Sequence, residues 1–174
     1  MSKKERFLLD ADSFIRSKRE HYAFDICPGF WDALLQASGH GRVVSIAAIR
    51  TELLRGKDAL ANWVKDSVPE NVFEAVEIDG GGDAYRRVAD WVENSQQYSR
   101  AAKQKFFGDA DPLLVAAAIT NGDILATYEV SAPNSKAIVK IPDVARHFGV
   151  KCIAPYVMLR RLGVRLSLDR RKGK

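Results

Sequence analysis

Cysteine and histidine are scarce in this sequence, which limits the kinds of site it can build. The two cysteines, Cys27 and Cys152, lie far apart, and neither has a CxxC partner. A disulfide framework or a cysteine-rich zinc site is therefore not expected, and we expect both thiols to be reduced and buried. The three histidines stand at positions 21, 40 and 147, too scattered to indicate a zinc cluster.

Long apolar segments and glycine-rich phosphate loops are also missing. No apolar run approaches the roughly 18 residues that a membrane span needs. The charged start Met1–Arg6 is followed by too short an apolar stretch for a signal peptide. We therefore expect a cytoplasmic protein with no membrane partner. The motifs GxxxxGK(S/T) and GxGxxG are absent, so binding of a nucleoside triphosphate or a dinucleotide is not expected.

The residues that are present fit one basic globular domain. The chain has 174 residues, 47% of them apolar, enough for one core without disulfides or a structural metal. We expect a single domain over residues 1–166 and a basic tail over residues 167–174. The net charge of +5 and the pI of about 9.3 are consistent with a polyanionic partner such as nucleic acid.

Hydrophobic periodicity predicts strands that alternate with helices. The predicted strands are 6–10, 43–46, 72–78, 124–128 and 150–153. The predicted helices are 28–39, 49–54, 57–66, a long helix starting near 85, 99–107, 109–121, 144–148 and 155–162. Such alternation indicates an α/β fold with three α/β/α layers, in which helices cover both faces of a mostly parallel sheet of four to five strands.

Acidic residues follow or flank several of these elements. Asp10 ends the first strand and Glu129 ends the fourth, while Glu52 and Asp111 lie on helices that follow. Ligands of open α/β sheets bind at the carboxyl ends of the strands, so we expect these four carboxylates to converge there. Gathered carboxylates repel one another unless a cation joins them, and Mg²⁺ or Mn²⁺ takes oxygen ligands. The residues alone therefore indicate a metal site that processes phosphate esters.

Each acid also has an ordinary structural interpretation. Asp10 can cap the next helix, or Asp12 can be the cap and leave Asp10 for a metal. Glu52 by itself is compatible with a surface glutamate. Asp111 stands before Pro112, as an N-cap residue before a proline at the first helical position would. Asp109 is expected to be a surface acid or a group that supports the metal ligands.

Several short motifs resemble those of PIN-domain nucleases. These motifs are Leu8–Asp12, Thr51–Leu54, Ala110–Ala116 and Thr127–Glu129, and their order matches over most of the chain. Two further segments, Tyr22–Trp31 and Ser135–Pro142, resemble an uncharacterised bacterial and archaeal PIN-like family that tends to be encoded in toxin–antitoxin-like pairs. Position 12 is Asp where PIN proteins often carry Asn, and position 129 is Glu where Asp is commoner.

The resemblance implies an endoribonuclease that depends on Mg²⁺ or Mn²⁺ and acts as the toxin of such a pair. The catalytic and metal-binding residues would be Asp10, Glu52, Asp111 and Glu129, with supporting roles for Asp12, Asp109 and Thr127. The basic residues expected to contact substrate phosphate are Lys136, Lys140 and Arg16. The expected partners are RNA, a small antitoxin protein and, as an open option, a second copy of the chain.

Two other functions stay open at this point. The segment Asp10-Ala11-Asp12 also fits the opening motif of haloacid-dehalogenase-type phosphatases, with Asp10 as the nucleophile. That family also needs a lysine, and only Lys103 and Lys105 are placed to supply it, on a helix expected at the surface. The second alternative is a non-catalytic PIN-like module that binds RNA or a protein.

Overall fold

Five parallel strands form one sheet in the order β3-β2-β1-β4-β5. The structure is a computed structural model that describes residues 4–76 and 82–167. The strands are β1 (Phe7–Leu9), β2 (Val43–Ile46), β3 (Phe73–Glu74), β4 (Ile124–Ala126) and β5 (Cys152–Ile153). The chain moves outward from β1 to β2 and β3, then returns to the other side of β1 for β4 and β5. The strand order therefore reverses between β1 and β4.

This reversal determines where a ligand crevice can form. In open parallel sheets, the crevice lies at the carboxyl ends of the two strands at which the order reverses. The register pairs Leu9 of β1 with Ala126 of β4, so both strands end at the same level. Asp10 and Thr127, the next residue in each strand, therefore stand side by side at this point.

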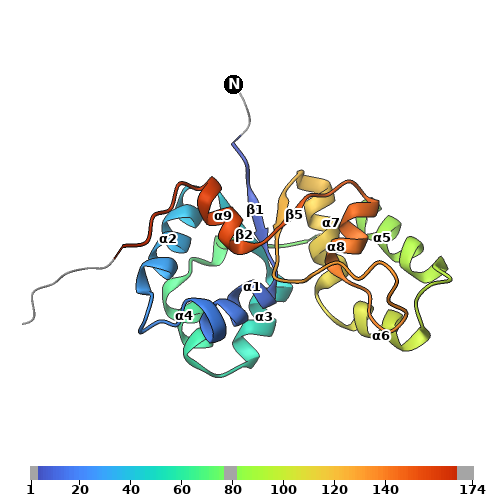
Figure 1. The fold of residues 1–174 in the computed structure, drawn as a ribbon, viewed down its shortest axis with the longest axis horizontal. Helices are drawn as coiled ribbons and strands as arrows, with labels where there is room; N and C mark the ends of the chain where they lie inside the picture. Colours follow the sequence, from blue (N-terminus) through green and yellow to red (C-terminus); the bar gives the residue numbers. More distant parts are fainter. Residues whose placement is uncertain (1–3, 77–81, 168–174) are drawn as a thin grey trace, which may run out of the picture.

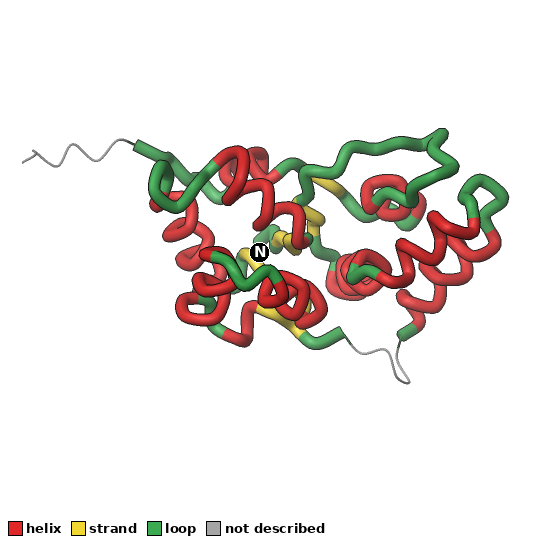
Figure 2. Tube along the Cα trace, turned by 90° about the horizontal axis from the view of Figure 1, so that it is seen from below, coloured by secondary structure: helices red, strands yellow, loops and turns green. Residues whose placement is uncertain are grey.

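Helices cover both faces of the sheet. One side carries α1 (Ala11–Arg16), α2 (Pro28–Gly39), α3 (Ala47–Arg55), α4 (Ala59–Ser67) and α9 (Pro155–Arg161), as Figure 1 shows. The other side carries α5 (Asp83–Asn94), α6 (Arg100–Gly108), α7 (Asp111–Asn121) and α8 (Ile141–His147). A π-helical turn (Ser17–His21) extends α1, and a 3-10 turn (Glu70–Val72) precedes β3. In Figure 2 the strands lie between these two helical layers.

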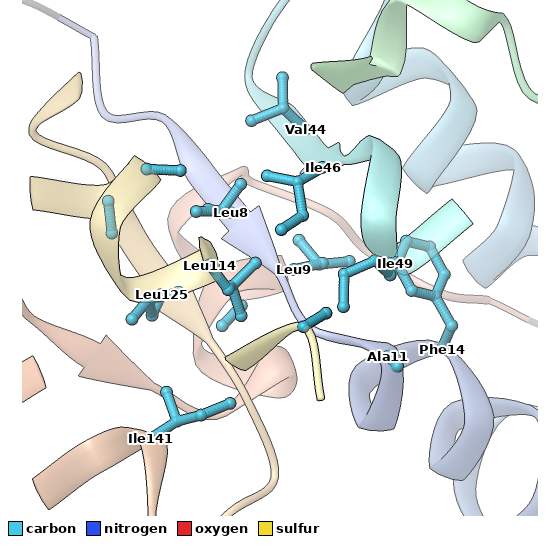
Figure 3. Packing of buried hydrophobic residues seen from close by; sticks show 14 of the residues in the cluster. Leu8, Leu9, Ala11, Phe14, Val44, Ile46, Ile49, Leu114, Leu125 and Ile141 are labelled. Carbon is cyan, nitrogen blue, oxygen red and sulfur yellow. The ribbon is translucent and has the colours of Figure 1, made fainter. Parts of the chain in front are cut away.

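The core surrounds the central strands. Phe7, Leu8 and Leu9 of β1 are each at most 1% exposed, because neighbouring strands flank β1 and helices cover both of its faces. Side chains from β1, β2, β4, α3 and α7 meet in this core (Figure 3). Burial on both faces explains why β1 is a continuous apolar run rather than an alternating one.

Helix α7 is the central helix of its layer. It packs on α5, α6 and α8 and on strands β2 and β4, so it is apolar nearly all round, as predicted. It ends at Gly122, whose φ of 71° lies in the left-handed region that glycine adopts without strain. This packing holds the first turn of α7 against the carboxyl edge of the sheet.

The predicted fold class is confirmed, with differences at particular elements. The predicted strand 72–78 is wrong at its start, because Val72 belongs to the 3-10 turn and β3 covers only Phe73–Glu74. Residues 77 and 78 of that prediction and the tail beyond Ser167 lie outside the described residues. No residue range was predicted for α1, although Asp10 and Asp12 were considered as caps of a helix that follows β1. Within the described ranges, no helix is long and apolar enough to cross a membrane.

Candidate functional site

Asp10 is almost completely buried at the carboxyl end of β1, with 2% of its surface exposed. Its Oδ1 accepts a hydrogen bond from the Ser13 backbone N–H at 2.7 Å, which makes Asp10 the N-cap of α1. Its Oδ2 accepts from the Thr127 hydroxyl at 2.5 Å. Burial raises the pKa of Asp10 to about 6, although both hydrogen bonds oppose the rise. Asp10, not Asp12, is thus the N-cap of α1. Asp10 also lies at the carboxyl edge of the sheet, as predicted.

Thr127 is the counterpart of Asp10 on the neighbouring strand. The sequence predicted that Glu129 ends its strand as Asp10 does, but β4 ends at Ala126 and Glu129 lies in the loop that follows. The Thr127 hydroxyl donates to Asp10 and accepts from the Glu129 backbone N–H at 2.9 Å. It therefore connects the buried aspartate to the start of the loop that carries Glu129.

Asp111 lies at the start of α7 and is partly buried. It is the first helical residue and Ala110 is the N-cap, so the prediction that Asp111 caps the helix is wrong. Within the described part of the chain, the Asp111 carboxylate makes no hydrogen bond or ion pair. Burial, together with four neighbouring acids, raises the pKa of Asp111 to about 7. In decreasing order of effect, these acids are Glu129, Asp109, Asp10 and Glu52.

Glu52 and Asp109 lie at the rim of this group. Glu52 is on α3, exposed to solvent, and partial desolvation followed by the charge of Asp109 raises its pKa. Asp109 follows α6 directly, and its carboxylate pairs with Lys105 at 2.7 Å. The two acids come from opposite helical layers and interact electrostatically. The predicted set Asp10, Glu52, Asp111 and Glu129 thus shares one electrostatic environment, joined by Asp109.

The Glu129 carboxylate is held by two consecutive residues. Its Oε1 lies 3.0 Å from Lys140 Nζ, and its Oε2 accepts from the Ile141 backbone N–H at 2.9 Å. Ile141 is the first residue of α8, so Glu129 satisfies one free N–H at the start of that helix. Lys140, predicted to contact phosphate, here pairs with an acid. Lys136 is exposed, and its side chain has no hydrogen bond or ion pair within residues 4–76 and 82–167.

Asp12 and Arg16 lie on α1 beside the same edge. Arg16 pairs with Glu20 at 2.9 Å and lies 3.7 Å from Asp12, and its guanidinium is 5.0 Å from the centre of the Tyr128 ring. Burial raises the pKa of Asp12, Arg16 opposes the rise, and the charge of Glu129 adds to it. Arg16, predicted to contact substrate phosphate, thus pairs with the acids Glu20 and Asp12 of its own helical segment.

A polar anchor that sequence reasoning missed holds the loop between β4 and α8. Asp143 is 6% exposed and accepts from the Ser131 hydroxyl at 2.5 Å, the Ala132 backbone N–H at 2.9 Å and Arg146 at 2.7 Å. The loop fixed in this way carries Glu129 and Lys140. No spacing motif links Ser131 to Asp143, so the sequence offered no signal for this contact.

The acidic group borders a small pocket of about 120 Å³. Its charged lining residues are Asp109, Asp111, Glu129, Lys105 and Lys140, and its apolar part comes from α6 and the segment 137–139. Three carboxylates and two ammonium groups thus line one pocket. Such a pocket can take a phosphate group on its lysines and a cation on its acids.

Comparison with protein families identifies the domain without identifying an activity. The model of a domain of unknown function, DUF4411, matches residues 7–166. The chain belongs to this family. A search of curated proteins gave no match. The parallel α/β architecture of this DUF4411 domain is compatible with a PIN-like fold, and the family description names no function.

The arrangement of the acidic side chains in this DUF4411 domain bears on whether they could bind a divalent cation. Within the described residues, no three His, Cys, Asp or Glu side chains are gathered closely enough to hold a metal ion. The hydrogen bonds give a physical reason. Asp10 is held by Ser13 and Thr127, and Glu129 is held by Lys140 and Ile141. The carboxylates therefore lie around a common region, but their oxygen atoms do not converge on a single metal position.

The chemistry and charge of the region nevertheless fit Mg²⁺ or Mn²⁺. All the donor atoms are carboxylate oxygens, and burial together with the repulsion of the neighbouring acids raises the pKa of Asp111. Among the described residues, Asp111 and Glu52 are the carboxylates of this set without a hydrogen bond or ion pair, and of the two only Asp111 is partly buried. Asp10 and Asp111 are the residues that would hold the ion. Glu52 and Glu129 lie beside them, and Glu129 would have to exchange Lys140 for the ion.

Proposed function

We propose that this DUF4411 domain is a metal-dependent nuclease that hydrolyses phosphodiester bonds of RNA. The observation that supports this proposal most directly is the state of the Asp111 carboxylate. This carboxylate is partly buried and has no hydrogen bond or ion pair among the described residues. Burial and four neighbouring acids raise its pKa to about 7. Such an arrangement is costly for stability, because Lys105 and Lys140 pair with Asp109 and Glu129 and leave the charge of Asp111 without an ion pair. Strongly perturbed carboxylates at the reversal point of a parallel sheet favour a catalytic role over a structural one.

Each group of residues has a role in this proposal. Asp10 and Asp111 would hold Mg²⁺ or Mn²⁺, which when bound supplies a water-activating charge beside the scissile phosphate. The Thr127 hydroxyl fixes both Asp10, to which it donates, and Glu129, whose backbone N–H it accepts from. Lys140, Lys136 and Arg16 would hold the phosphate backbone of RNA on the basic side of the pocket.

The phosphatase alternative is less well supported. Its mechanism needs Asp10 as the nucleophile and a lysine beside it. The lysine that this mechanism needs does not reach Asp10, because Lys103 donates to the Glu93 carbonyl oxygen and Lys105 pairs with Asp109. A non-catalytic module would not need uncompensated acids at its centre. The toxin role depends on the sequence resemblance alone.

Cleavage of a mixed pool of end-labelled RNA tests the proposal. We expect cleavage with millimolar Mn²⁺ or Mg²⁺, none with EDTA, and loss of cleavage in Asp111→Asn, which removes a charge with little change in volume. The matched control is Asp90→Asn, since Asp90 is an exposed aspartate on α5.

The outcomes separate the three functions. Equal cleavage by Asp111→Asn and the wild type, both freed of contaminating ribonuclease, would refute the proposal. A phosphoaspartate trapped by acid quench at Asp10 would establish the phosphatase. RNA binding that is independent of metal and unaccompanied by cleavage would establish the binding module. Expression in bacteria tests the toxin role: wild type should arrest growth, and Asp111→Asn should not.

A further inference from the structure

The ion pair between Lys140 and Glu129 lies at the acidic pocket. The two side chains are 26% and 20% exposed, so both charges are largely shielded from water. Nζ reaches one carboxylate oxygen, and the Ile141 N–H holds the other. Glu129 is therefore fixed from two sides by adjacent residues of one backbone segment.

Lys140 interacts with more of the acidic group than Glu129 alone. Its charge also lowers the pKa of Asp12, and it lines the same pocket as Asp111. The other lysine of the pocket, Lys105, is 71% exposed and committed to Asp109 at the rim. Of these two lysines, Lys140 is the one whose ammonium is partly buried among the acids.

A divalent cation and Lys140 would compete for Glu129. The Oε2 atom can stay on the Ile141 N–H while Oε1 changes its partner. Without metal, the Lys140 ammonium offsets part of the carboxylate repulsion. With metal, the same ammonium would add a positive charge beside another one, which is unfavourable at short range.

We propose that Lys140 is a built-in counter-ion of the acidic pocket, which a divalent cation displaces from Glu129 when it binds. This inference rests on the proposed metal-dependent function and concerns the order of events at the site. The released ammonium stays at the pocket, free to contact a substrate phosphate. Lys140 would thus weaken metal binding in the free protein and strengthen substrate binding once the metal is present.

The test measures Mn²⁺ affinity of the full-length protein by calorimetric titration, with no substrate and no activity readout. Lys140→Met removes the ammonium and keeps the length of the side chain, and we expect Mn²⁺ to bind about fivefold more tightly. Lys136→Met is the matched control, because it makes the same charge change on an exposed residue of the same loop. We expect it to change Mn²⁺ affinity by less than about twofold.

A second variant shows whether the effect passes through Glu129. In a Glu129→Gln background, Lys140→Met and Lys136→Met should have the same effect on Mn²⁺ affinity. If Lys140→Met fails to fold, as circular dichroism would show, Lys140→Gln replaces it in both backgrounds. If the wild type binds Mn²⁺ and Lys140→Met binds it equally or more weakly, the counter-ion role is overturned and the nuclease proposal stands. Absence of Mn²⁺ binding in every variant would overturn both.

Discussion

The Thr127 hydroxyl donates a hydrogen bond of 2.5 Å to Asp10, across a sequence separation of 117 residues. This bond joins the residues that follow β1 and β4, the two strands between which the strand order reverses. Because Asp10 also caps α1 and Thr127 accepts from Glu129, one chain of hydrogen bonds runs from α1 to the loop before α8. The positions of Asp10 and Glu129 thus depend on one hydroxyl group between them.

Thr127→Val should destabilise the fold and lower activity. The substitution keeps the shape of the side chain but removes a buried donor to Asp10 and an acceptor for the Glu129 N–H. We expect a loss of about 1–3 kcal/mol in the free energy of unfolding, measured by urea denaturation. Thr51→Val, at an exposed threonine that bonds only within its own helix, should change stability by less than about 0.5 kcal/mol. Equal effects of the two variants would contradict the role given to Thr127.

Asp111→Asn should stabilise the metal-free protein in a way that depends on pH. The pKa of Asp111 is raised from an ordinary 3.8 to about 7, so the folded state binds a proton more tightly than the unfolded state does. Its favourable contribution is fully present below about pH 4 and is lost as the pH rises through about 7. At pH 8 we expect the variant to exceed wild type by about 1–2 kcal/mol, a value discounted for partial exposure.

Urea denaturation in EDTA at pH 4.5 and pH 8 checks this pH dependence. The difference between Asp111→Asn and wild type should shrink at the lower pH, and Asp90→Asn should show no such dependence. A variant less stable than wild type at both values would show that the carboxylate is a structural group rather than a strained one.

Mn²⁺ should raise the melting temperature of the wild type. A cation that binds the native state alone adds roughly 2.7 kcal/mol at a hundredfold excess over its dissociation constant. For a chain of this size, that corresponds to roughly 5–10 °C. The increase should disappear with EDTA and be absent in Asp111→Asn. A wild-type midpoint that does not move at millimolar Mn²⁺ would count against a metal site of useful affinity.

Asp143→Ala should impair the site from a distance. Asp143 is buried and accepts from Ser131, Ala132 and Arg146, so its loss leaves three donors without their partner. We expect a cost of about 2–4 kcal/mol in unfolding free energy, measured by urea denaturation. RNA cleavage should fall as well, because the loop held by this anchor carries Glu129 and Lys140. Full cleavage at temperatures where the variant stays folded would show that the anchor does not position those two residues.

The sequence predicted the architecture well because its signals are local. The apolar run before Asp10, the all-round apolar helix ending at Gly122 and the alternation of strands and helices each follow from composition over a few residues. The range of helix α1 was not predicted because the helix has only six residues, and its cap lies inside what reads as the end of a strand. The start of the third strand was misplaced because Val72, apolar and buried, joins a 3-10 turn instead.

The sequence pointed to a candidate set of acids but not to the contacts that these acids make. The position of Asp10 after an apolar strand and of Asp111 at a helix start indicated that they converge. The partners of Glu129 and the anchor at Asp143 arise from a loop with no regular structure, whose path no local signal describes. Likewise, the match between Asp10 and Thr127 follows from strand register, which depends on the packing of the whole sheet.

The order in which a ribosome makes this chain has a consequence for the pocket. Asp10 and Glu52 belong to the early half of the chain, whereas Asp111, Thr127, Glu129 and Lys140 arrive late. Before β4 is synthesised, the sheet lacks the central neighbour of β1 that brings Thr127 to Asp10. A growing chain that stops short of Lys140 therefore lacks part of the pocket. Under the proposed nuclease function, the protein would be nearly complete before it could act on the message being translated.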